Sequence, residues 1–112
     1  MTGVGDLAAK SCQPCEGGSA ALTSPDISAL LVELDGWEQH GAFITKTYSF
    51  KDHYQAMAFV NAVAWISHRE NHHPDLHLGY KQCRIEYTTH ALDGLSENDF
   101  ICAAKVDALF RL

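Results

Sequence analysis

The sequence predicts an α+β fold in which a four-stranded antiparallel sheet has helices packed on one face. Three observations lead to this class. Two segments, residues 52–70 and 96–110, repeat apolar residues at helical spacing, and a helix-start signal precedes a third segment. Residues 37–50 and 76–89 lie between these helices and have the alternation of strands. The helices are therefore segregated from the strands, which is typical of an α+β domain.

The composition is that of an ordinary globular protein. A length of 112 residues suits one domain, and 46% hydrophobic with 20% charged residues argues against wholesale disorder. The net charge of -6 disfavours direct nucleic-acid binding, because an acidic chain repels phosphates. No signal peptide, apolar membrane span or basic surface run is evident, so we expect a cytoplasmic protein without membrane contact.

The first helix is expected to begin at Thr23 and to run to about Leu34. Thr23 supplies a hydroxyl N-cap, Pro25 lies in the first turn, and the acidic Asp26 follows. Gly36 then breaks the helix.

A hairpin of two strands is expected over residues 37–50. Its Thr and aromatic content fits a half-buried strand. Ile44 and Tyr48 share one parity, which Lys46 interrupts.

The long helix should begin at Asp52 and end near Glu70, because Pro74 disfavours helical geometry at the residue before it. Its apolar stripe is Ala56, Phe59, Val60, Val63 and Ile66.

The second strand pair is expected at Leu76–Tyr80 and Cys83–Thr89, with His90 at the end of the latter strand. Cys83, Ile85, Tyr87 and Thr89 point one way, and Arg84, Glu86, Thr88 and His90 point the other.

After a turn at Gly94, Ser96 should cap the last helix with Asp99 as its capping-box partner. The apolar face of this helix is Phe100, Ala103, Ala104, Val106, Leu109 and Phe110.

Residues 1–22 are small, polar and Gly-rich, and we expect a flexible arm preceding a domain over residues 23–112. The arm contains Cys12-Gln13-Pro14-Cys15, which is half of a zinc site without a second pair. We interpret Cys12 and Cys15 as unstructured thiols, with a redox pair or a shared intermolecular metal site as alternatives. Cys83 and Cys102 lie on apolar faces and are expected in the core.

Histidines are the most informative residues, because four of the seven, at positions 68, 72, 73 and 77, fall within ten residues. Three interpretations are open. They are surface or capping residues; or His68 and His72, at i and i+4, share a metal; or they handle protons without a metal, since imidazole titrates near neutrality. No His-Glu-x-x-His order or suitable acidic ligand set supports the metal.

One further pattern favours the third interpretation. The run His68-Arg69-Glu70-Asn71-His72-His73-Pro74-Asp75, then Tyr80, Thr89-His90, Gly94-Leu95-Ser96 and Asp99, resembles the signature of the pterin-4a-carbinolamine dehydratases. The resemblance extends over residues 22–112 and includes Gly36-Trp37 and Phe50-Lys51-Asp52. Many members have a carboxylate at the position of His68, so that negative charge, one helical turn from His72, is absent here.

The resemblance implies a hydro-lyase that removes water from 4a-hydroxytetrahydropterin, the product of aromatic amino acid hydroxylases, to give quinonoid dihydropterin. It implies no metal and no organic cofactor. It also implies that His72, His73 and His90 line the cleft. Our hypothesis is that His72 and His90 handle protons at the 4a-hydroxyl and N5 while His73 positions the pterin.

Further substrate-site candidates surround these histidines. Asp99 is expected to cap the last helix and orient a neighbour, Tyr80 either stacks near the pterin or lies in the core, and Pro74 shapes the turn. The complete set of substrate-binding candidates is His68, Pro74, Asp75, Tyr80, Thr89 and Asp99.

Two other functions stay open. One is a protein-interaction module, because animal members of the family act as coactivators that stabilise the dimerisation helices of a homeodomain transcription factor. The other is a paralogue acting on a different pterin, as in molybdopterin metabolism. Family members are homodimers or homotetramers, and a four-stranded sheet has two edges to cover or pair.

Overall fold

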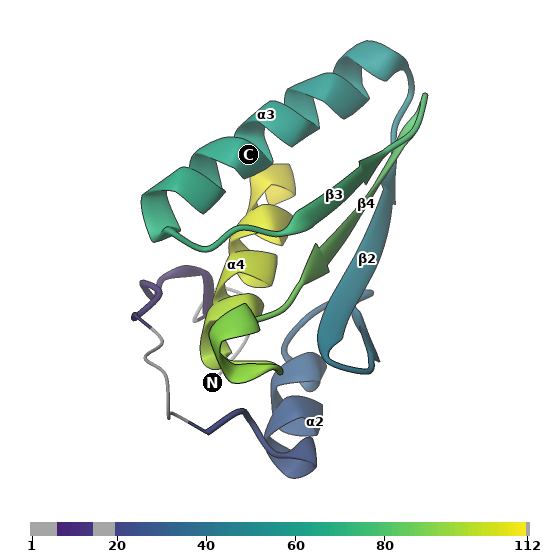
Figure 1. The fold of residues 1–112 in the computed structure, drawn as a ribbon. Helices are drawn as coiled ribbons and strands as arrows, with labels where there is room; N and C mark the ends of the chain where they lie inside the picture. The colour runs from purple at the N-terminus through teal and green to yellow at the C-terminus, as the bar shows by residue number, and fades with distance from the viewer. Residues whose placement is uncertain (1–6, 15–19, 112) are drawn as a thin grey trace.

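The computed structural model describes residues 7–14 and 20–111. A four-stranded antiparallel sheet has the order β1 (Glu38–His40), β2 (Phe43–Ser49), β4 (Gln82–Tyr87) and β3 (Asp75–Leu78). Helices α3 and α4 cover one face of this sheet, and α2 lies near one of its ends (Figure 1). The predicted α+β class and sheet are therefore confirmed.

The helices begin where the capping signals place them. Helix α2 (Ser24–Val32) has the Thr23 and Asp26 capping box, and α3 (His53–Glu70) starts after Asp52, whose carboxylate accepts from the Gln55 amide. Helix α4 (Glu97–Ala108) has the predicted Ser96 and Asp99 capping box. Leu109–Arg111 continue as a 3-10 turn, η2, so two residues of the predicted apolar face lie beyond α4.

Several boundaries differ from the expectation. Helix α2 ends at Val32, two residues before Leu34, and Gly36 follows in a turn with a φ of 80°. Strand β3 ends at Leu78, and β4 ends at Tyr87. A short 3-10 helix, η1 (His90–Leu92), takes the place of the expected strand end at His90.

The change at His90 has a local cause. Thr89 pairs with Gly94 in an isolated bridge, and Asp93 between them adopts a left-handed conformation with a φ of 50°. This tight loop closes the chain back on itself directly after Thr89. His90 therefore starts a turn and is not a member of the sheet.

The core lies between the sheet and the two long helices. Cys83, Ile85 and Tyr87 are buried on β4, and Thr89 is buried beside them, in agreement with the predicted parity. Cys102 on α4 is also buried, as expected. Burying a large apolar side chain stabilises a fold by about 1.5–3 kcal/mol, so these contacts dominate its stability.

The Lys46 side chain faces the helices, because polar groups there bind its ammonium group. Its Nζ lies 2.9 Å from Asp107 Oδ1 and donates to the carbonyl oxygen of Asp35 at 2.6 Å. Asp107 also accepts from the Tyr48 hydroxyl and from Trp37 Nε1. The break that Lys46 makes in the strand pattern is thus explained by a carboxylate on α4.

Residues 7–14 pack against the domain. Leu7 is only 2% exposed and joins the core, and Lys105 Nζ donates to the carbonyl oxygen of Ala8 at 2.7 Å. These residues do not behave as the loosely attached arm expected for residues 1–22. Cys15 lies outside the described residues, and the boundary at residue 22 stays a prediction.

Candidate active site

The end of α3 determines where His72 lies. Asn71 caps the helix in a left-handed conformation with a φ of 52°. The His72 amide then donates back to the carbonyl oxygen of Ser67 at 3.2 Å. This type of cap satisfies carbonyl groups that would otherwise lack a partner, and Pro74 just beyond it prevents the helix from continuing. The cap therefore fixes the position of the His72 backbone directly after the last turn of α3.

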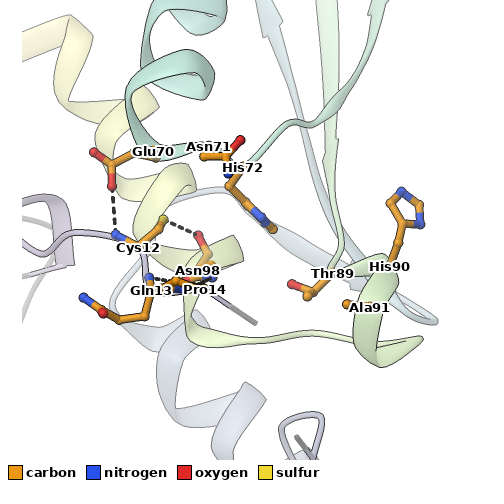
Figure 2. Close-up of a pocket in the computed structure, with 10 residues that line it drawn as sticks. All are labelled: Cys12, Gln13, Pro14, Glu70, Asn71, His72, Thr89, His90, Ala91 and Asn98. Carbon is orange, nitrogen blue, oxygen red and sulfur yellow. Dashed lines mark hydrogen bonds between the residues drawn. The ribbon is translucent and has the colours of Figure 1, made fainter. Parts of the chain in front are cut away.

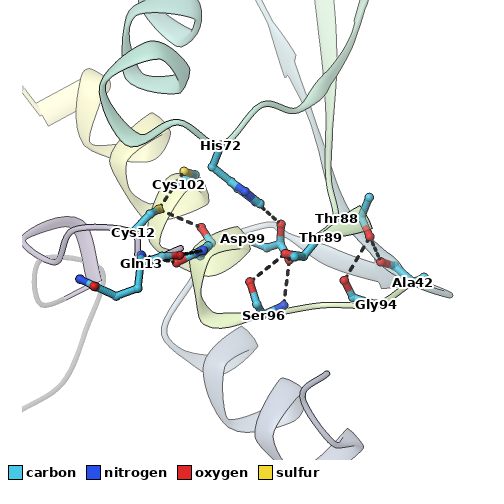
Figure 3. A network of polar contacts seen from close by, with 11 residues as sticks. Cys12, Gln13, Ala42, His72, Thr88, Thr89, Gly94, Ser96, Asp99 and Cys102 are labelled. Carbon is cyan, nitrogen blue, oxygen red and sulfur yellow. Dashed lines mark hydrogen bonds and ion pairs between the residues drawn. The ribbon is translucent and has the colours of Figure 1, made fainter. Parts of the chain in front are cut away.

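His72 forms the central contact of the site with Asp99. His72 Nε2 lies 2.6 Å from Asp99 Oδ1, and the Asp99 side chain is 0% exposed, whereas that of His72 is 12% exposed. The other oxygen of Asp99 accepts from Thr89 Oγ1 at 2.8 Å and from the Ser96 amide at 3.0 Å. Figure 3 shows these bonds converging on the carboxylate. Asp99 thus caps α4, as the sequence predicts, and the neighbouring side chain that it contacts is His72.

The His72 ring also stacks on a tyrosine. Its centroid is 5.9 Å from that of Tyr87, and the two planes differ by 6°. Tyr87 is completely buried, and its hydroxyl has no hydrogen-bond partner among the described residues. Burial, and next the neighbouring Cys102, raise the pKa of Tyr87 well above its usual range. His72 is therefore fixed at its ring face as well as at its Nε2.

A cavity of about 420 Å³ opens beside this pair. Figure 2 shows its walls, with Cys12 on one side of His72 and His90 on the other. Its lining residues are Cys12, Gln13, Pro14, Glu70, Asn71, His72, Thr89, His90, Ala91 and Asn98. The structure therefore brings His72, Thr89 and His90 to one cavity, with Asp99 behind His72.

Three predicted site residues lie near this cavity without lining it. His73 and Asp75 are exposed, and Pro74 is half-buried. They follow His72 directly in the chain, so they stay at the margin of the site.

Two others are farther away. His68 is exposed on α3, where its ring lies 6.1 Å from that of Trp65. Tyr80 is 70% exposed and stacks on His53, the first residue of α3. Since α3 has 18 residues and is about 27 Å long, Tyr80 lies at the opposite end of this helix from His72. The structure does not bring Tyr80 to the site.

Sequence reasoning missed the wall formed by residues 12–14 and the ring of Tyr87. The Cys12 amide donates to Glu70 Oε1 at 2.8 Å, and the Gln13 amide donates to Asn98 Oδ1 at 3.0 Å. These contacts join residues 58 and 85 positions apart, which no local pattern reveals. The burial parity did place Tyr87 on the helix-facing side, but it could not show the stacking on His72.

Within the described ranges, no group of three or more His, Cys, Asp or Glu side chains is arranged to hold a metal ion. No helix in these ranges has the length and apolar character needed to cross a bilayer.

Comparisons with known proteins agree with the sequence signature. A family model described as "Pterin 4 alpha carbinolamine dehydratase" matches residues 20–109. Proteins of Nitrosospira multiformis and Nitrosomonas europaea, each named "Putative pterin-4-alpha-carbinolamine dehydratase", are 60% and 58% identical to this chain. The matches cover 99% of this chain in both cases, and 98% and 99% of those proteins.

Solved structures share the fold. A transcriptional coactivator/pterin dehydratase from Brucella melitensis has a TM-score of 0.77 and 30% identity, covering 80% of this chain and 97% of its own. A pterin dehydratase-like protein described as a RuBisCO assembly factor in the alpha-carboxysome has a TM-score of 0.55 and 27% identity, covering 65% and 84%. With its family match and its relatives of nearly equal length, this chain belongs to the pterin-4-alpha-carbinolamine dehydratase family.

Proposed function

We propose that this protein removes water from 4a-hydroxytetrahydropterin to give quinonoid dihydropterin, and so recycles the pterin of aromatic amino acid hydroxylases. The observation that carries the proposal is the His72 and Asp99 pair at a cavity that His90 also lines. The volume of about 420 Å³ lies within the usual range of small-molecule sites. Family membership supports a pterin as the substrate class.

The reaction needs two proton transfers. The bond between C4a and the hydroxyl oxygen breaks as that oxygen gains a proton, and N5 loses its proton as the C4a–N5 double bond forms. Imidazole can act in both directions near neutral pH, and each such transfer contributes about 10²- to 10⁴-fold in rate. Two histidines on one cavity therefore suit this chemistry.

Asp99 prepares His72 for one of these transfers. When Nε2 donates its hydrogen to the carboxylate, Nδ1 is left with a lone pair, and in the imidazolium form it carries the transferable proton. The buried carboxylate also stabilises the positive charge that appears on the ring when it accepts a proton. We propose that His90 handles the second proton.

The remaining residues have supporting roles in this proposal. His73 positions the pterin from the margin of the cavity, together with Pro74 and Asp75. Thr89 holds Asp99 through its hydroxyl, and that hydroxyl also lies 2.7 Å from Ser96 Oγ. We propose no contact with the substrate for His68 or Tyr80.

The test is a coupled assay with purified full-length protein, in which an aromatic amino acid hydroxylase supplies 4a-hydroxytetrahydropterin. We expect the wild type to accelerate dehydration, and His72→Ala, His73→Ala and His90→Ala each to lose most of this acceleration. His77→Ala is the matched control, because His77 is exposed on β3, where it lies 3.4 Å from Glu86 and lines no part of this cavity. An inactive wild type, or equal losses in His72→Ala and His77→Ala, contradicts the proposal.

An interaction role is the alternative, since one similar structure is a transcriptional coactivator/pterin dehydratase and another is described as an assembly factor. A protein that only binds partners has no need of the His72 and Asp99 pair. We also propose a cytoplasmic homodimer or homotetramer that needs neither metal nor organic cofactor. Strands β1 and β3 form the edges of the sheet and are available for pairing.

A further inference from the structure

Two thiols from distant parts of the chain meet beside the cavity. Cys12 Sγ lies 3.5 Å from Cys102 Sγ (Figure 3). Cys12 is half-buried and lines the cavity, whereas Cys102 is buried on α4. Cys12 Sγ is also 3.7 Å from the carbonyl oxygen of Asn98, so Cys102 can donate to Cys12 while Cys12 donates to Asn98.

Hydrogen bonds of the Cys12 and Gln13 backbone hold the two sulfur atoms close together. The Cys12 amide donates to Glu70 Oε1 at 2.8 Å. At the next residue, the Gln13 amide donates to Asn98 Oδ1 at 3.0 Å, and Asn98 Nδ2 donates to the Gln13 carbonyl at 2.6 Å. The segment is therefore attached to the ends of both α3 and α4, and the closeness of the two sulfurs follows from this attachment.

We propose that Cys12 and Cys102 form a reversible disulfide, which fastens the wall formed by residues 12–14 to α4. A disulfide bond is about 2.05 Å long, so the sulfurs must approach by about 1.5 Å from their 3.5 Å separation. Rotation of the Cys12 side chain within its loop can supply a movement of this size. The oxidant is a low-molecular-weight disulfide such as oxidised glutathione.

The exchange proceeds in two balanced steps. The Cys12 thiol loses its proton, and its sulfur attacks oxidised glutathione, which gives a mixed disulfide and releases one glutathione thiolate. The Cys102 thiol then loses its proton and attacks the Cys12 sulfur, which forms the internal disulfide and releases the second glutathione. The two protons that the protein thiols lose pass to the two glutathione thiolates, so two thiols of the protein are oxidised and one glutathione disulfide is reduced to two thiols.

The order of the steps follows from the surroundings of each thiol. Cys12 is accessible from the cavity, whereas Cys102 is enclosed. The hydrogen bond with Cys12, and next burial, raise the pKa of Cys102, with smaller contributions from Glu70 and Asp99. Cys102 therefore keeps its proton until the mixed disulfide is beside it, and so acts second.

The disulfide would act on the substrate cavity. Cys102 lies three residues after Asp99 on α4, so the two residues are on the same side of the helix. The bond would link the helix that orients His72 to the opposite cavity wall. The Gln13 amide, bonded to Asn98, exchanges its hydrogen only when this wall opens, so oxidation should slow that exchange.

The test uses full-length Cys15→Ser protein, because Cys15 is the nearest competing thiol in sequence. After treatment with oxidised glutathione, alkylation and digestion, mass spectrometry should find a peptide pair linked through Cys12 and Cys102. The link should be absent from added Cys12→Ser or Cys102→Ala variants and present in Cys83→Ala. Cys83→Ala is the matched control, because Cys83 is a buried thiol on β4 that takes no part in the contact between Cys12 and Cys102.

Hydrogen exchange gives the second readout. We expect the Gln13 amide to exchange about tenfold more slowly in the oxidised protein than in the reduced protein. Glutathione that stays attached to Cys12, a link between two chains, or a wild-type protein that forms only a Cys12–Cys15 disulfide would overturn the proposal. Neither readout measures pterin turnover, so failure here is distinguishable from failure of the proposed function.

Discussion

His72 Nε2 lies 2.6 Å from Asp99 Oδ1, and this contact joins the turn after α3 to the first turn of α4. The same carboxylate accepts from the Ser96 amide, so one side chain both caps a helix and orients the candidate catalytic ring. Its stability role and its catalytic role can be separated by substitution.

Asp99→Asn should lower kcat by about a hundredfold, because an amide cannot stabilise the imidazolium as a carboxylate does. Its free energy of unfolding should fall by only about 1–2 kcal/mol. Asp93→Asn makes the same chemical change at an exposed residue whose left-handed conformation asparagine tolerates. Coupled-assay kinetics and urea unfolding of both variants measure the effects. A comparable loss of kcat in Asp93→Asn would contradict a catalytic role that is specific to Asp99.

Tyr87→Phe should leave the protein equally stable or stabilise it by up to about 1 kcal/mol, because it removes a buried hydroxyl without a partner. Tyr48→Phe is the matched substitution and should destabilise the protein by about 1 kcal/mol, since the Tyr48 hydroxyl donates to Asp107. Thermal unfolding midpoints compare the two variants. If both substitutions destabilise equally, the Tyr87 hydroxyl has a partner in solution.

Asp107→Ala should reduce the free energy of unfolding by about 3 kcal/mol, because Tyr48 and Trp37 lose the acceptor of their hydrogen bonds and Lys46 loses its ion pair, keeping only the Asp35 carbonyl. Chemical denaturation checks this value. Glu97→Ala is the control: its pair with Lys10 is half exposed on both sides and should contribute less than about 1 kcal/mol. Similar losses in the two variants would show that the Asp107 cluster is as weak as a surface pair.

The protein should lose stability at alkaline pH. Burial, followed by Asp107 for Tyr48 and Cys102 for Tyr87, raises the pKa of both tyrosines in the folded state. Their unfolded pKa is about 10, so above this pH the unfolded state binds fewer protons and stability falls as pH rises. Below about pH 9 the contribution of these groups is fully present.

Urea midpoints measured from pH 8 to 11 in a reducing buffer check this expectation. The decline above pH 10 should approach about 1.4 kcal/mol per pH unit for each tyrosine. The double variant Tyr48→Phe and Tyr87→Phe should lose the share of this slope that the two tyrosines contribute, and the remaining slope should belong to the buried thiols. An unchanged slope in the double variant assigns the decline to other groups, such as Cys83 and Cys102, whose pKa values are also raised.

Much of the fold could be predicted because its signals are local. Thr23, Asp52 and Ser96 bond to groups within three residues, and these bonds place the helix starts. The strands were harder to delimit, because Tyr80 has strand propensity but leaves the sheet to stack on His53.

The site was only partly predictable, because part of it depends on contacts between residues that are far apart in the chain. His72, Thr89, His90 and Asp99 carry a family signature, whereas the wall at Cys12 depends on bonds to residues 58 to 90 positions away. A Gly-rich composition favours a flexible arm and contains no information about such distant acceptors. Lys46 shows the same limit, since its half-buried position facing the helices follows from Asp107, 61 positions later.

The left-handed cap at Asn71 has a consequence for how this chain can vary in length. Each residue added to a helix rotates everything beyond it by about 100°. A single insertion or deletion between Asp52 and Asn71 would therefore swing His72 away from Asp99 and also turn the buried side of α3 outward. Changes in length should be tolerated at the exposed hairpin turns near Gly41 and Gly79, and strongly selected against within α3.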